Sequence, residues 1–111
     1  MSLDDLAHIA SHGDRLSFAA SGSWTAPNAN DLEERVEAAG THDVRSIEID
    51  LGRVEELDVF GAWLLQRLIR GAEERGRTAR LTNVPDRFRA LIEKVERTNR
   101  KAPAVRERRR G

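Results

Sequence analysis

The sequence contains no cysteine, and this absence removes several kinds of chemistry at once. Without thiols the chain forms no disulfide, offers no thiolate metal ligand and carries no cysteine nucleophile. It also has no apolar run near the roughly 20 residues that a membrane span requires. The opening residues, MSLDDLAHIA, lack the basic start and apolar stretch of a signal peptide. We therefore expect a soluble, cytoplasmic chain.

Net charge is absent too, because 19 basic residues balance 19 acidic ones. The balance is uneven along the chain, however, because the final segment, RTNRKAPAVRERRRG, holds seven Arg or Lys residues and one Glu. That segment has no apolar periodicity and contains no base-reading element, so we do not expect nucleic-acid binding. We expect one compact domain over residues 1–97, followed by a basic tail over 98–111 that is either juxtamembrane or disordered.

Hydrophobic periodicity predicts the element order β-β-α-β-α-β-α. Two alternating runs around Gly13-Asp14 indicate antiparallel strands joined by a type II′ turn. The predicted elements are strands at 5–11 and 15–22, a helix at 27–39, a strand at 45–54, a helix between Leu57 and Gly76, a strand at 77–84 and a helix at 85–98. The expected fold is α/β, a mixed sheet with helices mainly on one face.

Aromatic residues are scarce, and two of the five lie in one helical stretch, EELDVFGAWLLQRLIRG, residues 55–71. At about 100° per residue, the core-facing arc of this helix centres on Leu68, and Trp63 falls nearly opposite. Val59 and Phe60 flank Trp63. An apolar cluster beside arginines is typical of a protein-interaction surface. The alternative, that the hairpin or the tail covers the cluster, stays open on geometry alone.

Asp58 is placed to cap the start of this helix. Its carboxylate is expected to accept an amide N–H from Phe60 or Gly61, and its charge suits the positive helix end. Gly61 in the first turn costs about 1 kcal/mol against alanine. A glycine is tolerated there if another backbone approaches the helix closely.

Catalytic and metal-binding patterns were sought and are weak. His8 and His12 are predicted on one strand, roughly 13 Å apart, which is too far to share an ion. His42 is expected in a polar surface loop. Glu48 and Asp50 share one face of a predicted strand, and we expect that face to be exposed to solvent. With no phosphate-binding glycine motif in the chain, we expect no enzyme activity, no metal and no cofactor.

Several short motifs together resemble a known family. IEIDLGRVEELDVFGAWLL, followed by RTARLTNVPDRFRALIEKV, is similar to a STAS domain, the fold of anti-anti-sigma factors and of transporter-linked regulatory modules. The matching elements are Asp50-Leu51, Asp58-x-x-Gly61 and Asn83-Val84-Pro85. The resemblance covers about residues 5–97 and implies the STAS-like fold.

The sequence departs from the family at the position directly after the motif aspartate. Anti-anti-sigma factors carry a phosphorylated Ser or Thr there, whereas this chain has Val59. Valine accepts no phosphate, so the resemblance implies a partner surface without a phosphorylation switch. The form Asp-x-x-Gly-Ala-Trp-Leu-Leu most resembles the segment fused to the N-terminus of MlaE-type permeases of ABC lipid transporters.

That resemblance implies a noncatalytic regulatory module that contacts the ATPase subunit and its own permease segment. The partner-binding residues it implies are Asp58, Val59, Phe60, Gly61, Ala62, Trp63, Arg67 and Arg70. The basic tail suits an anionic membrane surface, which predicts a location at the cytoplasmic face of the inner membrane. Three alternatives remain: a free anti-anti-sigma-like regulator acting without phosphorylation, a homodimer through the exposed aromatics, and a small-molecule binder.

Overall fold

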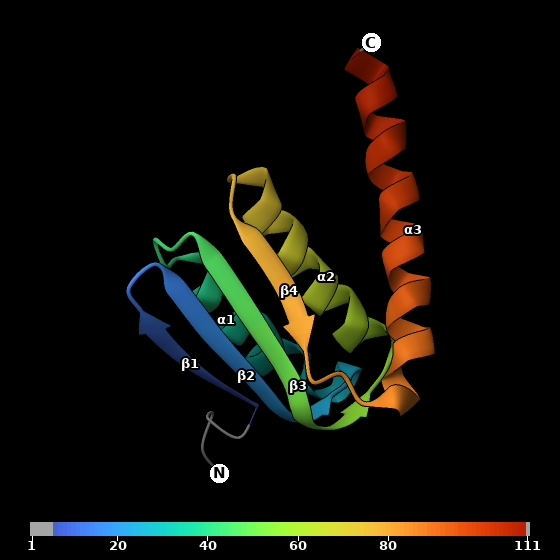
Figure 1. Cartoon of the computed structure of the whole chain (residues 1–111). Helices are drawn as coiled ribbons and strands as arrows, with labels where there is room; N and C mark the ends of the chain where they lie inside the picture. Colours follow the sequence, from blue (N-terminus) through green and yellow to red (C-terminus); the bar gives the residue numbers. More distant parts are fainter. Residues whose placement is uncertain (1–5, 111) are drawn as a thin grey trace.

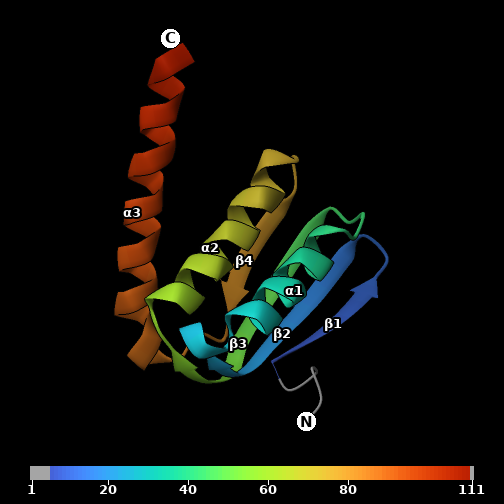
Figure 2. The same cartoon turned by 180° about the vertical axis from the view of Figure 1, so that it is seen from behind.

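A four-stranded sheet forms one layer of the protein, and α1 and α2 lie across one of its faces (Figure 1, Figure 2). The computed structural model describes residues 6–110, with side chains as far as Thr98. The elements are β1 (Ala7–His12), β2 (Arg15–Trp24), η2 (Ala26–Asn28), α1 (Ala29–Gly40), β3 (Ser46–Leu57), α2 (Val59–Glu74), β4 (Thr78–Thr82) and α3 (Asp86–Arg110). The predicted order and the mixed α/β fold are confirmed.

The strands lie in the order β1-β2-β3-β4. β1 and β2 are antiparallel, and His12 pairs with Arg15 across the two-residue turn Gly13-Asp14. Gly13 has φ of 62°, as the first central residue of a type II′ turn requires. β3 is parallel to both β2 and β4. The predicted hairpin is confirmed, although residue 5, its expected first residue, lies outside the described part of the chain.

β2 and β3 both run further than the sequence pattern predicts, to Trp24 and Leu57. Their pairing shifts register twice, between Ala19 and Ser21 and again between Gly22 and Ser23. At both shifts the extra residue lies in β3, where it breaks the period-two alternation, whereas in β2 Trp24 remains in phase with Leu16, Phe18 and Ala20. The predicted ends at residues 22 and 54 are therefore too early.

The extension of β2 places Trp24 at the centre of the core. Its side chain is fully buried, and its ring packs edge-on against Phe18 with the centroids 5.8 Å apart. The indole Nε1–H donates to the carbonyl of Leu6 at 2.9 Å, so the burial leaves no polar atom unpaired. The predicted core positions Ile47, Ile49 and Leu51 of β3 are likewise buried.

The helices agree with prediction in number but differ at two ends. The expected helix at 27–39 begins as a 3-10 turn, η2, with a proline in its first residues. α3 starts as predicted and buries Phe88, Ile92 and Val95. Its backbone stays helical to Arg110 rather than ending at 98, and it extends away from the sheet (Figure 1). Arg, Lys, Ala and Glu favour helix even without an apolar stripe. Side chains of the predicted basic tail beyond Thr98 lie outside those described.

The opposite face of the sheet carries polar residues, as the alternation predicts. Ser17, Glu48 and Arg80 form one row across β2, β3 and β4. Arg80 Nη2 lies 2.8 Å from Glu48 Oε2, and this hydrogen bond lowers the pKa of Glu48 below its ordinary value. Asp50 accepts the backbone N–H of Gly52 at 2.8 Å. Both carboxylates thus have partners within their own domain.

We expect an NMR titration of Glu48 to give a depressed pKa, which Arg80→Gln raises towards the ordinary glutamate value. The pair stabilises the fold above the pKa of Glu48 in the unfolded chain, and this contribution is lost as pH falls through the lower folded pKa. The control is Arg45→Gln, which removes a different surface arginine. A Glu48 pKa that Arg80→Gln leaves unchanged would contradict the assigned cause.

Candidate functional site at the start of α2

The carboxylate of Asp58 joins two segments of the chain. Its Oδ1 accepts the backbone N–H of Gly61 at 2.9 Å, which confirms the predicted helix cap. Its Oδ2 accepts the backbone N–H of Ala26 at 2.9 Å, and its own backbone N–H donates to the carbonyl of Trp24 at 3.3 Å. The start of α2 is therefore held against the end of β2 and the beginning of η2.

Gly61 completes this junction because it lets two backbones meet. A Cβ at Gly61 would lie 1.9 Å from the carbonyl oxygen of Trp24, far inside any real contact distance. The predicted reason for a glycine in this turn, close approach of another backbone, is confirmed. No larger residue fits unless α2 moves away from β2.

Two apolar side chains stand out from the first turns of α2. Val59 is 62% exposed and Trp63 is 42% exposed, and among the described side chains they are the only large hydrophobic ones classed as exposed. They are four residues apart, so they lie on one face of the helix. The guanidinium carbon of Arg67, four residues further on, lies 5.6 Å from the centroid of the Trp63 ring. We call Val59, Trp63, Arg67 and Arg70 the docking surface.

Four residues of the predicted partner site do not belong to this surface: Asp58, which holds the junction described above, and Phe60, Gly61 and Ala62. Phe60 is half-buried and packs against the core, while Gly61 and Ala62 are buried. The reason is that α2 is flanked by α1 on one side and α3 on the other, as Figure 2 shows, so it buries more than its sheet-facing arc. Gln66 is buried for the same reason, at 5% exposure, although the wheel places it outside that arc.

The β1–β2 hairpin leaves the indole of Trp63 exposed, so this part of the covering alternative is wrong. The predicted outward direction of Trp63 is confirmed. Sequence reasoning missed Trp24, Ala26 and the second bond of Asp58, because the residues involved are 32 positions apart in the chain. The composition of the stretch around Asp58 carries no signal of that contact.

The histidines and carboxylates of the described residues do not converge on a reaction centre. His8 and His12 are exposed on β1, and a ring nitrogen of His42 lies 3.0 Å from the carbonyl of Ala38, which makes His42 part-buried rather than fully on the surface. Between residues 6 and 98 there is no group of three His, Asp or Glu side chains able to hold a metal. Within the described chain, no helix combines the length and apolarity needed to cross a membrane.

Comparison with known proteins identifies the family and the fold. The family profile described as "Mlab, STAS domain" matches residues 7–97. No curated protein matches the chain. A Ser-to-Glu variant of RsbS from Moorella thermoacetica has a TM-score of 0.65 at 19% identity, covering 80% of this chain and 76% of that one.

Two further structures share the fold. The anti-sigma factor antagonist SpoIIAA of Bacillus, in its unphosphorylated form, has a TM-score of 0.63 at 15% identity, covering 78% of this chain and 81% of that one. Mglu has a TM-score of 0.61 at 20% identity, over 72% of this chain. This chain spans only 20% of the length of Mglu. At such identities the likeness concerns the fold alone.

Replacing Asp58 by Ala should lower the free energy of unfolding by about 2 kcal/mol, because both the helix cap and the bond to Ala26 are lost. Asp58→Asn keeps one acceptor oxygen and remains a good helix cap, so it should lose about half as much. Urea unfolding of the two variants measures the difference. Equal losses in both variants would show that the Ala26 bond, and not the cap, dominates at this junction.

Proposed function

Because the chain belongs to the STAS domain family, we propose that it is a noncatalytic interaction and regulatory module of a bacterial ABC-type lipid transporter. In this proposal the domain binds the ATPase subunit through the docking surface, beside its own permease segment. The similarity of LDVFGAWLL to the N-terminal segment of MlaE-type permeases supports the transporter context. In this proposal the domain lies at the cytoplasmic face of the inner membrane, where the ATPase subunit of such a transporter is found.

The single observation that carries the docking proposal is the exposed indole of Trp63 on an anchored helix start. Tryptophan and arginine are the residues most enriched among interface hot spots. Here they lie together, with Arg67 over the Trp63 ring and Val59 one turn earlier. Because Asp58 and Gly61 fix the first turn against β2, the surface needs no rearrangement before binding, which limits the entropy lost on association.

The chemistry at Val59 supports a surface that is not switched by phosphorylation. Val59 is the first residue of α2 and is well exposed, so a hydroxyl residue here would be accessible to a kinase. A phosphate would add up to about two negative charges at the positive end of a helix. A valine instead keeps this position permanently apolar, and we propose that the domain binds its partner constitutively.

The final part of the proposal concerns residues 98–111. Their basic composition suits contact with an anionic leaflet, to which each Lys or Arg near the surface adds on the order of 1 kcal/mol of attraction. α3 carries this segment away from the sheet and away from α1 (Figure 1). Such a direction would allow the segment to reach a membrane or a permease while the docking surface stays available.

The second candidate is a free anti-anti-sigma-like regulator, which the fold likeness to SpoIIAA and RsbS favours. Titrating the chain with the transporter ATPase subunit and, separately, with an anti-sigma factor discriminates the two. Binding to the ATPase alone supports the transporter module. Binding to the anti-sigma factor alone supports the regulator.

Trp63→Ala should weaken binding to the ATPase subunit about thirtyfold, the effect of removing a hot-spot side chain worth about 2 kcal/mol. Isothermal titration calorimetry measures the affinity. Because the side chain is exposed, the thermal unfolding midpoint should barely move. Phe60→Ala is a poorer probe, since Phe60 packs against the core.

Two arginine variants extend this test, one on the docking surface and one as the matched control. Arg67→Ala should weaken binding, whereas Arg89→Ala should not, since Arg89 is exposed on α3 and pairs there with Asp86. An affinity that Trp63→Ala leaves unchanged would remove the docking surface from the proposal.

Val59→Glu tests whether the first turn must stay apolar. An acidic residue here is favourable to the helix by about 0.3–1 kcal/mol, so stability should be kept or slightly raised. Binding to the ATPase should fall by at least about tenfold, because a charge would have to be buried in an apolar contact. Val59→Ala, which removes only methyl groups, should have the smaller effect. Full affinity in Val59→Glu would place the interface elsewhere.

A further inference from the structure

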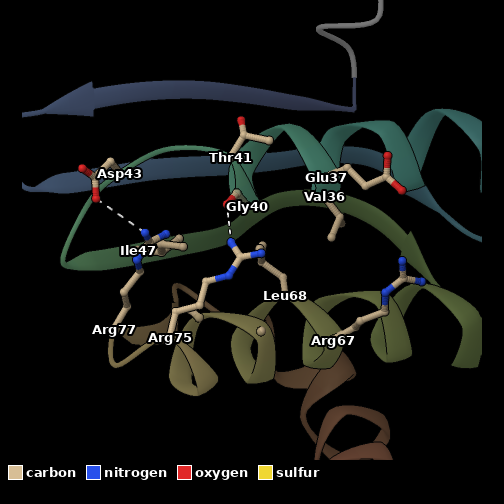
Figure 3. A pocket seen from close by; sticks show the side chains of 12 residues that line it. Val36, Glu37, Gly40, Thr41, Asp43, Ile47, Arg67, Leu68, Arg75 and Arg77 are labelled. Atoms are coloured by element: carbon tan, nitrogen blue, oxygen red, sulfur yellow. Dashed lines mark hydrogen bonds and ion pairs between the residues drawn. The ribbon is translucent and has the colours of Figure 1, made fainter.

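A groove separates the C-terminal half of α1 from that of α2. Its volume is about 690 Å³, and its lining includes the buried side chains of Val36, Leu68 and Ala72. Figure 3 shows Val36 and Leu68 facing each other between the two helices, with arginines along the α2 side. This volume lies within the roughly 300–1,000 Å³ typical of small-molecule sites.

Gly71 lines the groove and contributes no side chain to it. It lies inside α2, where glycine is among the least favourable residues. Unlike Gly61, it has no packing reason to be there, because a Cβ built on Gly71 meets nothing within 4 Å. The missing side chain therefore serves no contact within the domain and leaves space along the groove.

Three arginines and two carboxylates, Glu37 and Asp43, border the groove, and Arg77 lies 3.5 Å from Asp43 as an ion pair (Figure 3). The three arginines also have different further partners. Arg75 Nη1 donates to the carbonyl of Gly40 at 2.6 Å. Arg77 Nη1 donates to the carbonyl of His42 at 2.8 Å. These two satisfy carbonyl groups at and just after the end of α1. Arg67 makes no hydrogen bond or ion pair with residues 6–98, and its guanidinium lies over the Trp63 ring.

We propose that this groove binds an amphipathic anion, a short aliphatic chain bearing one carboxylate or phosphate. The chain would lie on the apolar floor between Val36 and Leu68, and the anionic head would meet the guanidinium of Arg67. A guanidinium binds either head group through two parallel hydrogen bonds. The site shares Arg67 with the docking surface, whereas its apolar floor and Gly71 lie outside that surface, so variants at Gly71 test the groove alone.

The test is a titration of the ¹⁵N-labelled chain with octanoate and with octyl phosphate, below their micelle concentrations. Saturable amide shifts should concentrate around Val36, Thr41, Leu68 and Ala72, with a dissociation constant on the order of 1 mM or tighter. Acetate, which lacks the chain, and 1-octanol, which lacks the charge, should each bind at least about tenfold more weakly. No saturable shift with either anion, or equal binding of 1-octanol, overturns the proposal.

Substitutions at two residues complete the test. Gly71→Leu fills the groove and should abolish the shifts, whereas Gly71→Ala, whose methyl group enters open space, should retain them. Arg67→Gln should weaken octanoate binding about tenfold, since one charged hydrogen-bonding group is lost. It also keeps the proposal testable if Gly71→Leu does not fold. Octanoate binding of wild-type strength in a folded Gly71→Leu or in Arg67→Gln overturns the site.

Discussion

The bridging carboxylate of Asp58 is the constraint on which the candidate interaction surface depends. One oxygen caps α2 and the other holds the start of η2, so the last residues of β2 and the first turn of α2 become a single unit. Gly61 permits the contact by admitting the carbonyl of Trp24 where a side chain would stand. The direction in which Val59 and Trp63 point is thereby set in part by a contact with Ala26, an exposed residue of η2 that lies 32 positions before Asp58 in the sequence.

The residues of this junction, Asp58 and Gly61, match the pattern of the family, whereas Val59 between them departs from it. In this chain the first turn of α2 leaves Val59 exposed, whereas Phe60, Gly61 and Ala62 are half-buried or buried. With a hydroxyl there, a domain can be switched by charge; with Val59, the surface keeps one chemical character. A module of this kind suits a permanent subunit contact better than a transient signalling event.

Much of the fold could be predicted from the sequence because its signals are local. The turn at Gly13, the alternation of Ile47 and Ile49 and the cap at Asp58 each depend on neighbouring residues. The errors arose where distant contacts decide. The extra residues in β3 concealed how far the pairing of β2 and β3 runs, and packing of α2 between α1 and α3 buried Ala62 and Gln66 despite their place on the helical wheel. A wheel treats a helix as having one buried side, whereas α2 has neighbours on three.

The two tryptophans occupy opposite environments, one sealed beside Phe18 and the other facing solvent beside Arg67. Emission from Trp24 reports the integrity of the interior, since its indole is dry and hydrogen-bonded to Leu6. Emission from Trp63 reports the surroundings of its exposed indole, which are solvent in the free protein and would change when a molecule binds there. The protein therefore carries two intrinsic fluorophores with separable meanings, and a collisional quencher such as iodide can distinguish them without any label.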